Sequence, residues 1–226
     1  MLASVVVPTY NEAKNIRGIV ESIISSADVE VIVIDDGSPD GTGKIADELA
    51  SAYGIRVIHR SGKLGLASAI LDGFKAASSD IVGVIDADFS HPTSLIPKLI
   101  EPIRAGQAEI AVGSRYVPGG GEENWPMWRR ITSAGAVLLA SPLTNVKDPV
   151  SGFFFLRKSV IEGVKLDTIG FKLGLEILVK GKYGRVIEVP YVFHDRSGGK
   201  SKFNYGEYVN YVRHLVMLYA HKLGLR

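Results

Sequence analysis

Apolar residues along the first half of the chain follow two alternating patterns. Short runs rich in valine and isoleucine predict buried strands at 3–8, 29–35, 55–59, 80–86 and 108–115. Between these runs, apolar residues recur every three or four positions, which predicts helices at 12–25, 41–53, 65–77 and 91–103. We expect Thr42 to cap the second helix, and Pro97 and Pro102 to interrupt the fourth. This alternation favours a mainly parallel sheet with helices on both faces.

A polar cluster follows each of the five predicted strands. The clusters are PTYNE (8–12), DDGSPDGT (35–42), RSGKLG (60–65), DADFSHP (86–92) and GSRY (113–116). Because ligands of such sheets bind beyond the carboxyl ends of the strands, all five clusters should share one edge. One polar cluster is an ordinary loop, whereas five at the same edge predict a binding site.

Asp86 and Asp88 end the fourth predicted strand and stand one residue apart. If the chain stays extended there, both carboxylates point the same way and could hold one cation. Oxygen ligands suit Mg²⁺ or Mn²⁺, which one or two carboxylates bind together with substrate phosphates and water. The alternative is that Asp86 ends the strand while Asp88 caps the next helix, and the pair taken alone favours this alternative. A phosphate-bearing ligand at the same edge would favour the metal site.

Composition excludes several classes of protein. The 226 residues are 46% hydrophobic and 22% charged, which fits one sizeable globular domain. The chain has no cysteine, which excludes disulfides and thiolate metal sites, and its net charge of +2 argues against a nucleic-acid partner. We find no signal peptide, no apolar run of about 18 residues, and no GxGxxG or Walker motif. We therefore expect no membrane span, dinucleotide site or P-loop.

Six motifs, in order along the chain, resemble the dolichol-phosphate mannosyltransferase group of family 2 glycosyltransferases. They are VVVPTYNEAKNI, VIVIDDGSPDGT, GKLGLASAILDGF, DADFSHPTSLIP, VGSRYVPGGG and DRSGGKSK. The resemblance implies an α/β fold of the glycosyltransferase A type in a single domain over 1–226. Within it we expect a nucleotide-sugar half at 1–115, an acceptor half at 116–204 and an amphipathic C-terminal helix at 205–226. The implied reaction is inverting transfer of mannose from GDP-mannose to dolichyl or another polyprenyl phosphate, with Mg²⁺ or Mn²⁺ as cofactor.

The resemblance also assigns roles to individual residues. The catalytic residues are Asp88, Arg115 and Arg130, and the metal ligands are Asp86, Asp88 and Ser90. The substrate-binding residues are Pro8, Tyr10, Glu12, Asp35, Asp36, Asp86, Ala87, Arg129, Ser133, Arg196, Lys200 and Lys202. Some relatives have glutamine where this chain has Ser90, so a water would bridge the shorter serine to the metal. The sequence leaves open which of Arg129 and Arg130 points inward.

Basic and aromatic residues in the second half suggest an entrance for the acceptor. Trp125 and Trp128 precede Arg129 and Arg130. The arginines would bind a lipid phosphate and the aromatics would lie at a membrane interface; the alternative is a core helix with a solvated basic end. The loop 194–208 carries three of the substrate-binding cations, and it is either a mobile lid, as in the family, or a solvated basic loop.

The remaining second half is predicted in less detail. The segment 148–161 resembles the family's acceptor-side strand and following helix, and 171–193 predicts a helix, a turn and a final strand. Asp148 is either functional or makes a turn before Pro149, and we expect the architectural role. Glu176 either reaches the site or lies on the surface of its helix. His91 is expected to cap the helix that follows it.

Two other functions compete with mannosyl transfer. One is transfer of glucose from UDP-glucose to the same type of lipid, and the other is a catalytically silent subunit that binds a nucleotide sugar. The second alternative predicts loss of the metal carboxylates or the phosphate-binding arginines, and both sets are present. A lipid acceptor implies a peripheral protein at the cytoplasmic face of a membrane. The helix 205–226 packs on the core or lies at the membrane surface, and a partner subunit, interfacial contact or a truncated sequence would each account for the missing anchor.

Overall fold

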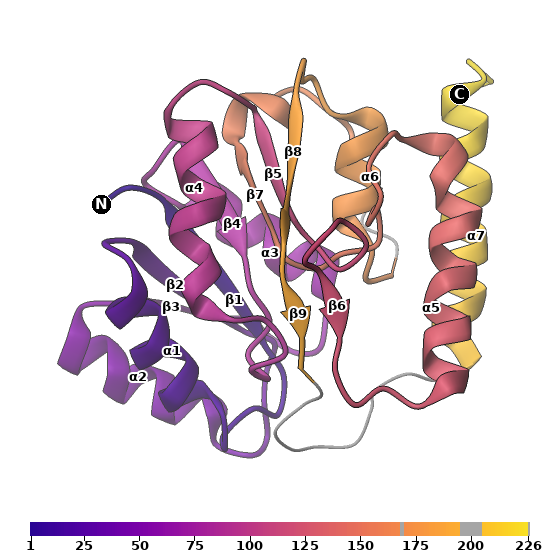
Figure 1. The fold of residues 1–226 in the computed structure, drawn as a ribbon. Coiled ribbons are helices and arrows are strands. Elements are labelled where there is room, and N and C mark those ends of the chain that lie inside the picture. Colours follow the sequence, from indigo (N-terminus) through magenta and orange to yellow (C-terminus); the bar gives the residue numbers. More distant parts are fainter. Residues whose placement is uncertain (168–169, 195–204, 226) are drawn as a thin grey trace.

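Seven strands form one sheet in the computed structural model, which describes residues 1–167, 170–194 and 205–225 (Figure 1). Across the sheet they are β3 (Arg56–His59), β2 (Glu30–Asp35), β1 (Ser4–Thr9), β4 (Ile81–Val84), β7 (Phe154–Arg157), β5 (Ile110–Ser114) and β8 (Val186–Pro190). β1 pairs in parallel with β2 and β4, β2 with β3, and β5 with β8. β7 runs antiparallel to both of its neighbours, β4 and β5. The predicted, mainly parallel sheet is confirmed.

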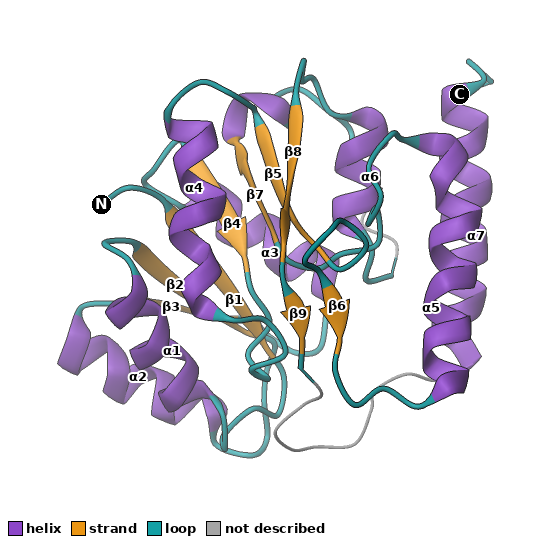
Figure 2. Ribbon diagram, in the orientation of Figure 1, coloured by secondary structure: helices purple, strands orange, loops and turns teal. Residues whose placement is uncertain are grey.

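The sheet is covered on both faces because successive side chains of a strand point to opposite sides. Val5 and Val7 of β1 pack with one set of helices, while Val6 between them packs with the other set. The first set is α1 (Ile16–Ser26), α2 (Thr42–Tyr53) and α4 (Ile96–Arg104); the second is α3 (Leu66–Ala76) and α6 (Leu173–Lys180). Figure 2 shows these helices on either side of the strands. All residues of β1 and β2 are buried, so the sheet centre forms the core.

A third apolar cluster lies outside the sheet, where α5 (Met127–Ala140) and α7 (Tyr205–Lys222) run side by side (Figure 1). The hydroxyl of Tyr211 donates to the carbonyl of Ala136 at 2.7 Å, and that of Tyr219 donates to the carbonyl of Leu139 at 2.8 Å. One face of α7 thus packs on the protein, while Val216 on another face is exposed. Within the described ranges, no helix has both the length and the apolarity to cross a membrane.

Several short elements complete the chain, and the structure differs from three local predictions. They are β6 (Gly121–Glu122), which pairs with β9 (Val192–Phe193), and the 3₁₀ turns η1 (Thr93–Leu95), η2 (Ser141–Leu143) and η3 (Lys158–Val160). Thr42 is the first residue of α2 and not its cap, because Gly41 takes the cap position with a left-handed φ of 92°. Pro97 lies in the first turn of α4, where a missing N–H costs little, and Pro102 lies inside that helix without ending it. The helix expected after β7 is only the 3₁₀ turn η3.

Candidate functional site

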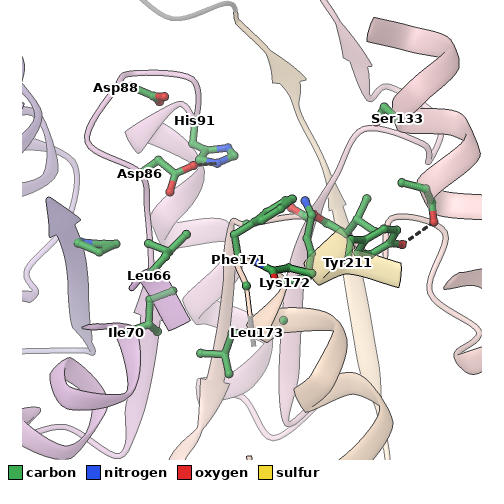
Figure 3. Close-up of a pocket in the computed structure, with 18 of the residues that line it drawn as sticks. Leu66, Ile70, Asp86, Asp88, His91, Ser133, Phe171, Lys172, Leu173 and Tyr211 are labelled. Carbon is green, nitrogen blue, oxygen red and sulfur yellow. Dashed lines mark hydrogen bonds and ion pairs between the residues drawn. The ribbon is translucent and has the colours of Figure 1, made fainter. Parts of the chain in front are cut away.

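A cavity of about 870 Å³ lies at the carboxyl ends of the strands. β4 and β5 are both antiparallel to β7, so they run in the same direction as each other and as β1, β2 and β3. Residues from all five predicted polar clusters line this one cavity. The helices α3, α5 and α7, the start of α6 and the segments just before β7 and α6 supply much of the remaining wall, part of which Figure 3 shows. The shared edge predicted for the clusters is confirmed.

Most of the predicted site residues lie on the cavity wall. Those that line it are Pro8, Tyr10, Glu12, Asp36, Asp86, Ala87, Asp88, Arg115, Arg129 and Ser133. Asp35, Ser90 and Arg130 are not part of the lining. Arg196, Lys200 and Lys202 lie outside the described residues, and so does most of the loop expected to act as a lid.

Asp86 and Asp88 project from a turn and not from one face of a strand. β4 ends at Val84, and Phe89 has a left-handed φ of 61°. The expected extended geometry is therefore wrong, because the backbone N–H of Ser90 donates to Asp88 at 3.1 Å and closes the chain into a turn. Figure 3 places Asp86 beside His91, with Asp88 farther along the same loop. Both carboxylates nevertheless face the same cavity.

The two carboxylates fit a divalent cation as part of a shared coordination shell. Mg²⁺ and Mn²⁺ prefer oxygen ligands, which both aspartates offer. Among the described residues, no group of three or more His, Cys, Asp or Glu side chains is arranged to hold a metal ion. Phosphate oxygens of a substrate and water would have to supply the remaining ligands. The side chain of Ser90 is buried and donates to Oδ1 of Asp88 at 2.5 Å, which orients that aspartate.

Asp35 and Asp36 use their carboxylates to shape the neighbouring loops. Asp36 accepts hydrogen bonds from the backbone N–H groups of Leu64 and Gly65 at 3.1 and 3.0 Å. It also forms an ion pair with Arg60 at 2.7 Å. Asp35 accepts from the hydroxyl of Ser38 at 2.5 Å and is buried. Of the two, only Asp36 also reaches the cavity.

Arg115 is tied to a carboxylate that is distant in sequence. Its Nε and Nη2 donate to Oδ2 and Oδ1 of Asp148, both at 2.8 Å, and its backbone N–H donates to Oδ2 at 3.0 Å. Burial alone would lower the pKa of Arg115, but its hydrogen bonds and attraction to Asp148 outweigh burial and hold that pKa above its ordinary value. Asp148 is fully buried and its carboxylate holds the side chain and backbone of Arg115, which fits the expected architectural role. Nη1 of Arg115 lies 3.5 Å from the hydroxyl of Ser133.

The structure separates the two adjacent arginines of α5. Arg129 lies over the ring of Trp125, with its guanidinium carbon 4.1 Å from the ring centroid, and it lines the cavity. Arg130 is exposed and donates to the backbone carbonyl of Glu122 at 3.3 Å. Successive residues of a helix differ in direction by about 100°, so only one of the pair can face inward. The catalytic role assigned to Arg130 does not fit this placement, whereas the binding role of Arg129 does.

Two residues of the cavity wall, His91 and Lys172, were given no role in the site by the sequence. His91 is buried, its ring stacks on Phe153 at 5.0 Å, and its Nε2 lies 3.3 Å from Oδ2 of Asp86. Its predicted role as a helix cap is wrong, because η1 is preceded by Pro92 and has no side-chain cap. Lys172 lines the cavity just before α6, and its Nζ donates to the carbonyl of Val150 at 2.7 Å. His91 lies within the predicted cluster 86–92, whereas Lys172 belongs to none of the five clusters.

Glu176 belongs neither to the surface nor to the cavity. It is fully buried and forms an ion pair with Lys180 of the same helix at 2.7 Å. It accepts a further hydrogen bond from the backbone N–H of Asp167 at 2.7 Å, and Nε2 of His214 in α7 lies 3.5 Å away. Burial raises the pKa of Glu176, but these three partners outweigh burial and lower that pKa to about 2. Both predictions for Glu176 are wrong, because α7 covers this face of α6.

Comparisons with known proteins identify the family to which this sequence is similar. The model of the family described as "Glycosyl transferase family 2" matches residues 4–164. A dolichol-phosphate mannosyltransferase of Pyrococcus furiosus is 48% identical over 96% of this chain, which spans 64% of that relative's length. A dolichol-phosphate mannosyltransferase of Saccharomyces cerevisiae is 37% identical over 98% of this chain and 88% of its own length.

The fold also resembles solved structures. A mannosyltransferase from Pyrobaculum calidifontis, solved in complex with GDP-mannose and Mn²⁺, superposes with a TM-score of 0.65 at 20% identity. The match covers 98% of this chain and 64% of that one. At this identity the likeness concerns the fold alone. The family match and the two curated relatives together show that the chain belongs to glycosyl transferase family 2.

Proposed function

We propose that the chain transfers mannose from GDP-mannose to the phosphate of dolichol or another polyprenol, with inversion at the sugar carbon. The observation that carries the proposal is that one cavity joins the carboxylates Asp86 and Asp88 to a basic and apolar wall formed by α5 and α7. The names of the curated relatives support the same reaction. A donor diphosphate and a lipid phosphate would meet where these two parts of the cavity adjoin.

The donor would occupy the end of the cavity formed by β1, β2 and β4. Pro8, Tyr10 and Glu12 follow β1 there and would contact the nucleoside, beside Asp36. Lys63, which lies 4.7 Å above the ring of Tyr10, adds a positive charge at this end. Asp86 and Asp88 would hold Mg²⁺ or Mn²⁺, which supplies charge stabilisation for the leaving diphosphate.

The acceptor would enter along α5. Arg129 and Ser133 line the cavity on this helix, and Ala136 and Leu139 continue the same wall with apolar surface. A lipid phosphate is already anionic near neutral pH, so it can attack the sugar carbon without a dedicated general base. The protein must instead bring two anions together, which cationic side chains do by stabilising the charge at both phosphates.

Exposed apolar side chains of α5 suit contact with a membrane that holds such a lipid. Met127, Trp128, Ile131 and Leu138 are all exposed, with Leu138 showing 72% of its surface. Tryptophan and aliphatic side chains on one helix are typical of proteins that lie in the membrane interface. We propose a peripheral position at the cytoplasmic face, with a partner subunit as one source of a firmer anchor.

A transfer assay tests the proposal. The full chain would be incubated with short-chain polyprenyl phosphate and either radiolabelled GDP-mannose or radiolabelled UDP-glucose, with Mg²⁺, Mn²⁺ or EDTA. We expect lipid-linked label only from GDP-mannose and only with a divalent cation. Label from UDP-glucose alone would identify the glucose alternative. No label from either donor would contradict transferase activity and favour a silent nucleotide-sugar-binding subunit.

A further inference from the structure

Lys172 places a positive charge in the middle of the cavity wall. It lies directly before α6, and its ammonium is 4.6 Å from the centroid of the Phe171 ring. In Figure 3, Phe171 and Lys172 lie between Asp86 with His91 on one side and Tyr211 with Ser133 on the other. This position is where the donor end and the acceptor end of the cavity adjoin.

Lys172 lacks the acidic partner that three other cations with little exposed side-chain surface have in the described part of the chain. Arg60 pairs with Asp36 at 2.7 Å, Arg115 with Asp148 at 2.8 Å, and Lys180 with Glu176 at 2.7 Å. Within the part of the chain that the structure describes, no carboxylate lies within 4.0 Å of the Lys172 ammonium, whose polar contact is the carbonyl of Val150. An enclosed cation without a counter-ion is costly, because it has lost water without gaining an opposite charge.

The cost of burying this charge lowers the pKa of Lys172. Burial and the positive charge of Arg115 lower the pKa of Lys172 to about 8, although Asp148 and Asp86 act in the opposite direction. At pH 7 most molecules of the protein therefore carry a protonated, positively charged Lys172. An anion that enters the cavity would supply the missing counter-charge, which neither aspartate supplies at close range.

Arg115 cannot supply this charge to a ligand at full strength. Two of its guanidinium nitrogens are committed to Asp148, whose negative charge offsets that of the arginine. A phosphate monoester carries between one and two negative charges near neutral pH. Lys172 and Arg129 both line the cavity on the acceptor side, and among the described residues no carboxylate lies within 4.0 Å of the Lys172 ammonium.

The lining beyond Lys172 indicates which anion fits. Leu173 follows it directly, and Tyr211, Ala136 and Leu139 continue the wall with mostly apolar surface. Leu173 and Gly174 are also the first residues of α6, whose amino-terminal end favours negative charge. A charged group followed by an apolar chain is the pattern of a lipid phosphate, whereas a nucleoside diphosphate continues into polar groups.

We propose that Lys172 binds the phosphate of the acceptor lipid, together with Arg129. This assignment rests on the proposed function, because it presupposes a lipid phosphate as the acceptor. The ammonium would form a charged hydrogen bond to a phosphate oxygen. This bond would either replace the contact with the carbonyl of Val150 or be added to it. No covalent step involves the lysine.

Binding measurements on the full chain test this role directly. Farnesyl phosphate serves as a soluble acceptor probe in isothermal titration calorimetry at pH 7, with farnesol and GDP as reference ligands. Lys172→Met keeps an unbranched side chain of similar length and removes the charge. We expect it to weaken farnesyl phosphate binding about tenfold to a hundredfold, the scale of one charged hydrogen bond. Binding of farnesol and of GDP should stay within about twofold of the parent.

Two further variants separate a binding role from a structural one. Lys172→Gln keeps a hydrogen-bond donor for the carbonyl of Val150 and removes the charge, so it should lose farnesyl phosphate as Lys172→Met does. Lys98→Met removes an exposed lysine from α4 on the other face of the sheet and should change nothing. Melting temperatures identify which variants are folded. If both Lys172 variants unfold, or lose GDP and farnesol equally, the lysine is structural and the proposal is wrong.

Steady-state kinetics then distinguish failure of this proposal from failure of the proposed function. If the parent transfers mannose, Lys172→Met should raise the KM for polyprenyl phosphate about tenfold and leave the KM for GDP-mannose unchanged. A parent that transfers mannose while the variant binds and uses the lipid normally overturns the role of Lys172 alone. A parent that transfers no sugar overturns the proposed function, whatever the variant binds.

Discussion

The guanidinium of Arg115 and the carboxylate of Asp148 form a two-point ion pair, with Nε to Oδ2 and Nη2 to Oδ1 both at 2.8 Å. Both side chains are buried, so each charge has lost contact with water and has the opposite charge of its partner instead. The pair joins the end of β5 to the loop before β7. The pair therefore holds in place the part of the cavity wall that Arg115 lines.

Removing one partner of this pair should destabilise the protein strongly. Asp148→Ala leaves Arg115 buried without a counter-ion, which costs about 3–5 kcal/mol in comparable buried pairs. Urea unfolding followed by circular dichroism measures the loss. The double variant Arg115→Met, Asp148→Leu removes both charges and should recover most of the lost free energy of unfolding. A loss below about 1 kcal/mol in the single variant would show that solvent reaches the pair.

The carboxylates after β4 should control metal binding without controlling stability. Asp86→Asn and Asp88→Asn keep the size of each side chain but remove a charge at the cavity, so Mn²⁺ binding measured by electron paramagnetic resonance should be lost. Sugar transfer should fall about 100-fold or more. Glu123→Gln is a control, because that carboxylate is exposed and pairs with His194 at 2.7 Å. Wild-type Mn²⁺ binding in both aspartate variants would refute the metal site.

Ser90 should influence the metal through Asp88 only. Its hydroxyl donates to Oδ1 of Asp88 at 2.5 Å, and its side chain does not reach the cavity. Residues that orient a metal ligand typically contribute 10–100-fold to metal affinity. We expect Ser90→Ala to weaken Mn²⁺ binding by about tenfold, clearly less than either aspartate variant. Equal losses in all three variants would indicate that the serine oxygen is itself a ligand.

Arg129 and Arg130 should separate in kinetics although they are adjacent. Arg129→Ala removes a cavity-lining cation and should raise the KM for polyprenyl phosphate about tenfold, the scale of a charged hydrogen bond. Arg130→Ala removes an exposed side chain whose described contact is the carbonyl of Glu122, so it should change that KM less than about threefold. Assays with a short-chain acceptor in detergent keep membrane attraction out of the comparison. A larger effect at Arg130 would mean that the helix turns on binding substrate.

The sequence was most informative where local pattern decides the outcome. Val5, Val6 and Val7 predict a strand buried on both faces, and the polar residues after each strand predict the shared edge that lines the cavity. The turn after β4 was missed because it depends on the left-handed Phe89 and on hydrogen bonds between Ser90 and Asp88. The spacing of Asp86 and Asp88 predicts a common direction for their side chains only if the backbone is extended, and here it turns.

Side-chain partners that are distant in sequence could not be predicted in the same way. Asp148 meets Arg115 across 33 positions, and His91 is enclosed by Phe153 and Tyr191, which come from the second half of the chain. The choice between Arg129 and Arg130 depends on the rotation of α5 about its axis, which is set by packing against the rest of the fold. The sequence therefore predicts which edge carries the site more reliably than which atoms face it.

Acid should weaken the attachment of α7 through Glu176. The pKa of this carboxyl is lowered from an ordinary 4.5 to about 2, because the hydrogen bonds and charges of His214, Lys180 and Asp167 outweigh burial. A lowered pKa means that the charged form stabilises the folded protein, so the stabilisation is complete above pH 4.5 and is lost as pH falls towards 2. The lost free energy of unfolding should be on the order of 3 kcal/mol over this range.

Urea unfolding between pH 7 and pH 2.5 measures this contribution as the difference between parent and Glu176→Gln. Other carboxylates titrate in both proteins, so only the difference reports on Glu176. The variant should be less stable at pH 7, and the difference should shrink as pH falls below 4.5, the ordinary pKa of the carboxyl. Glu48→Gln is the matched control, because Glu48 forms an exposed ion pair with Arg17 at 2.8 Å, and such pairs contribute less than about 1 kcal/mol. A constant difference at all pH values would show that Glu176 stabilises α7 by packing and not by charge.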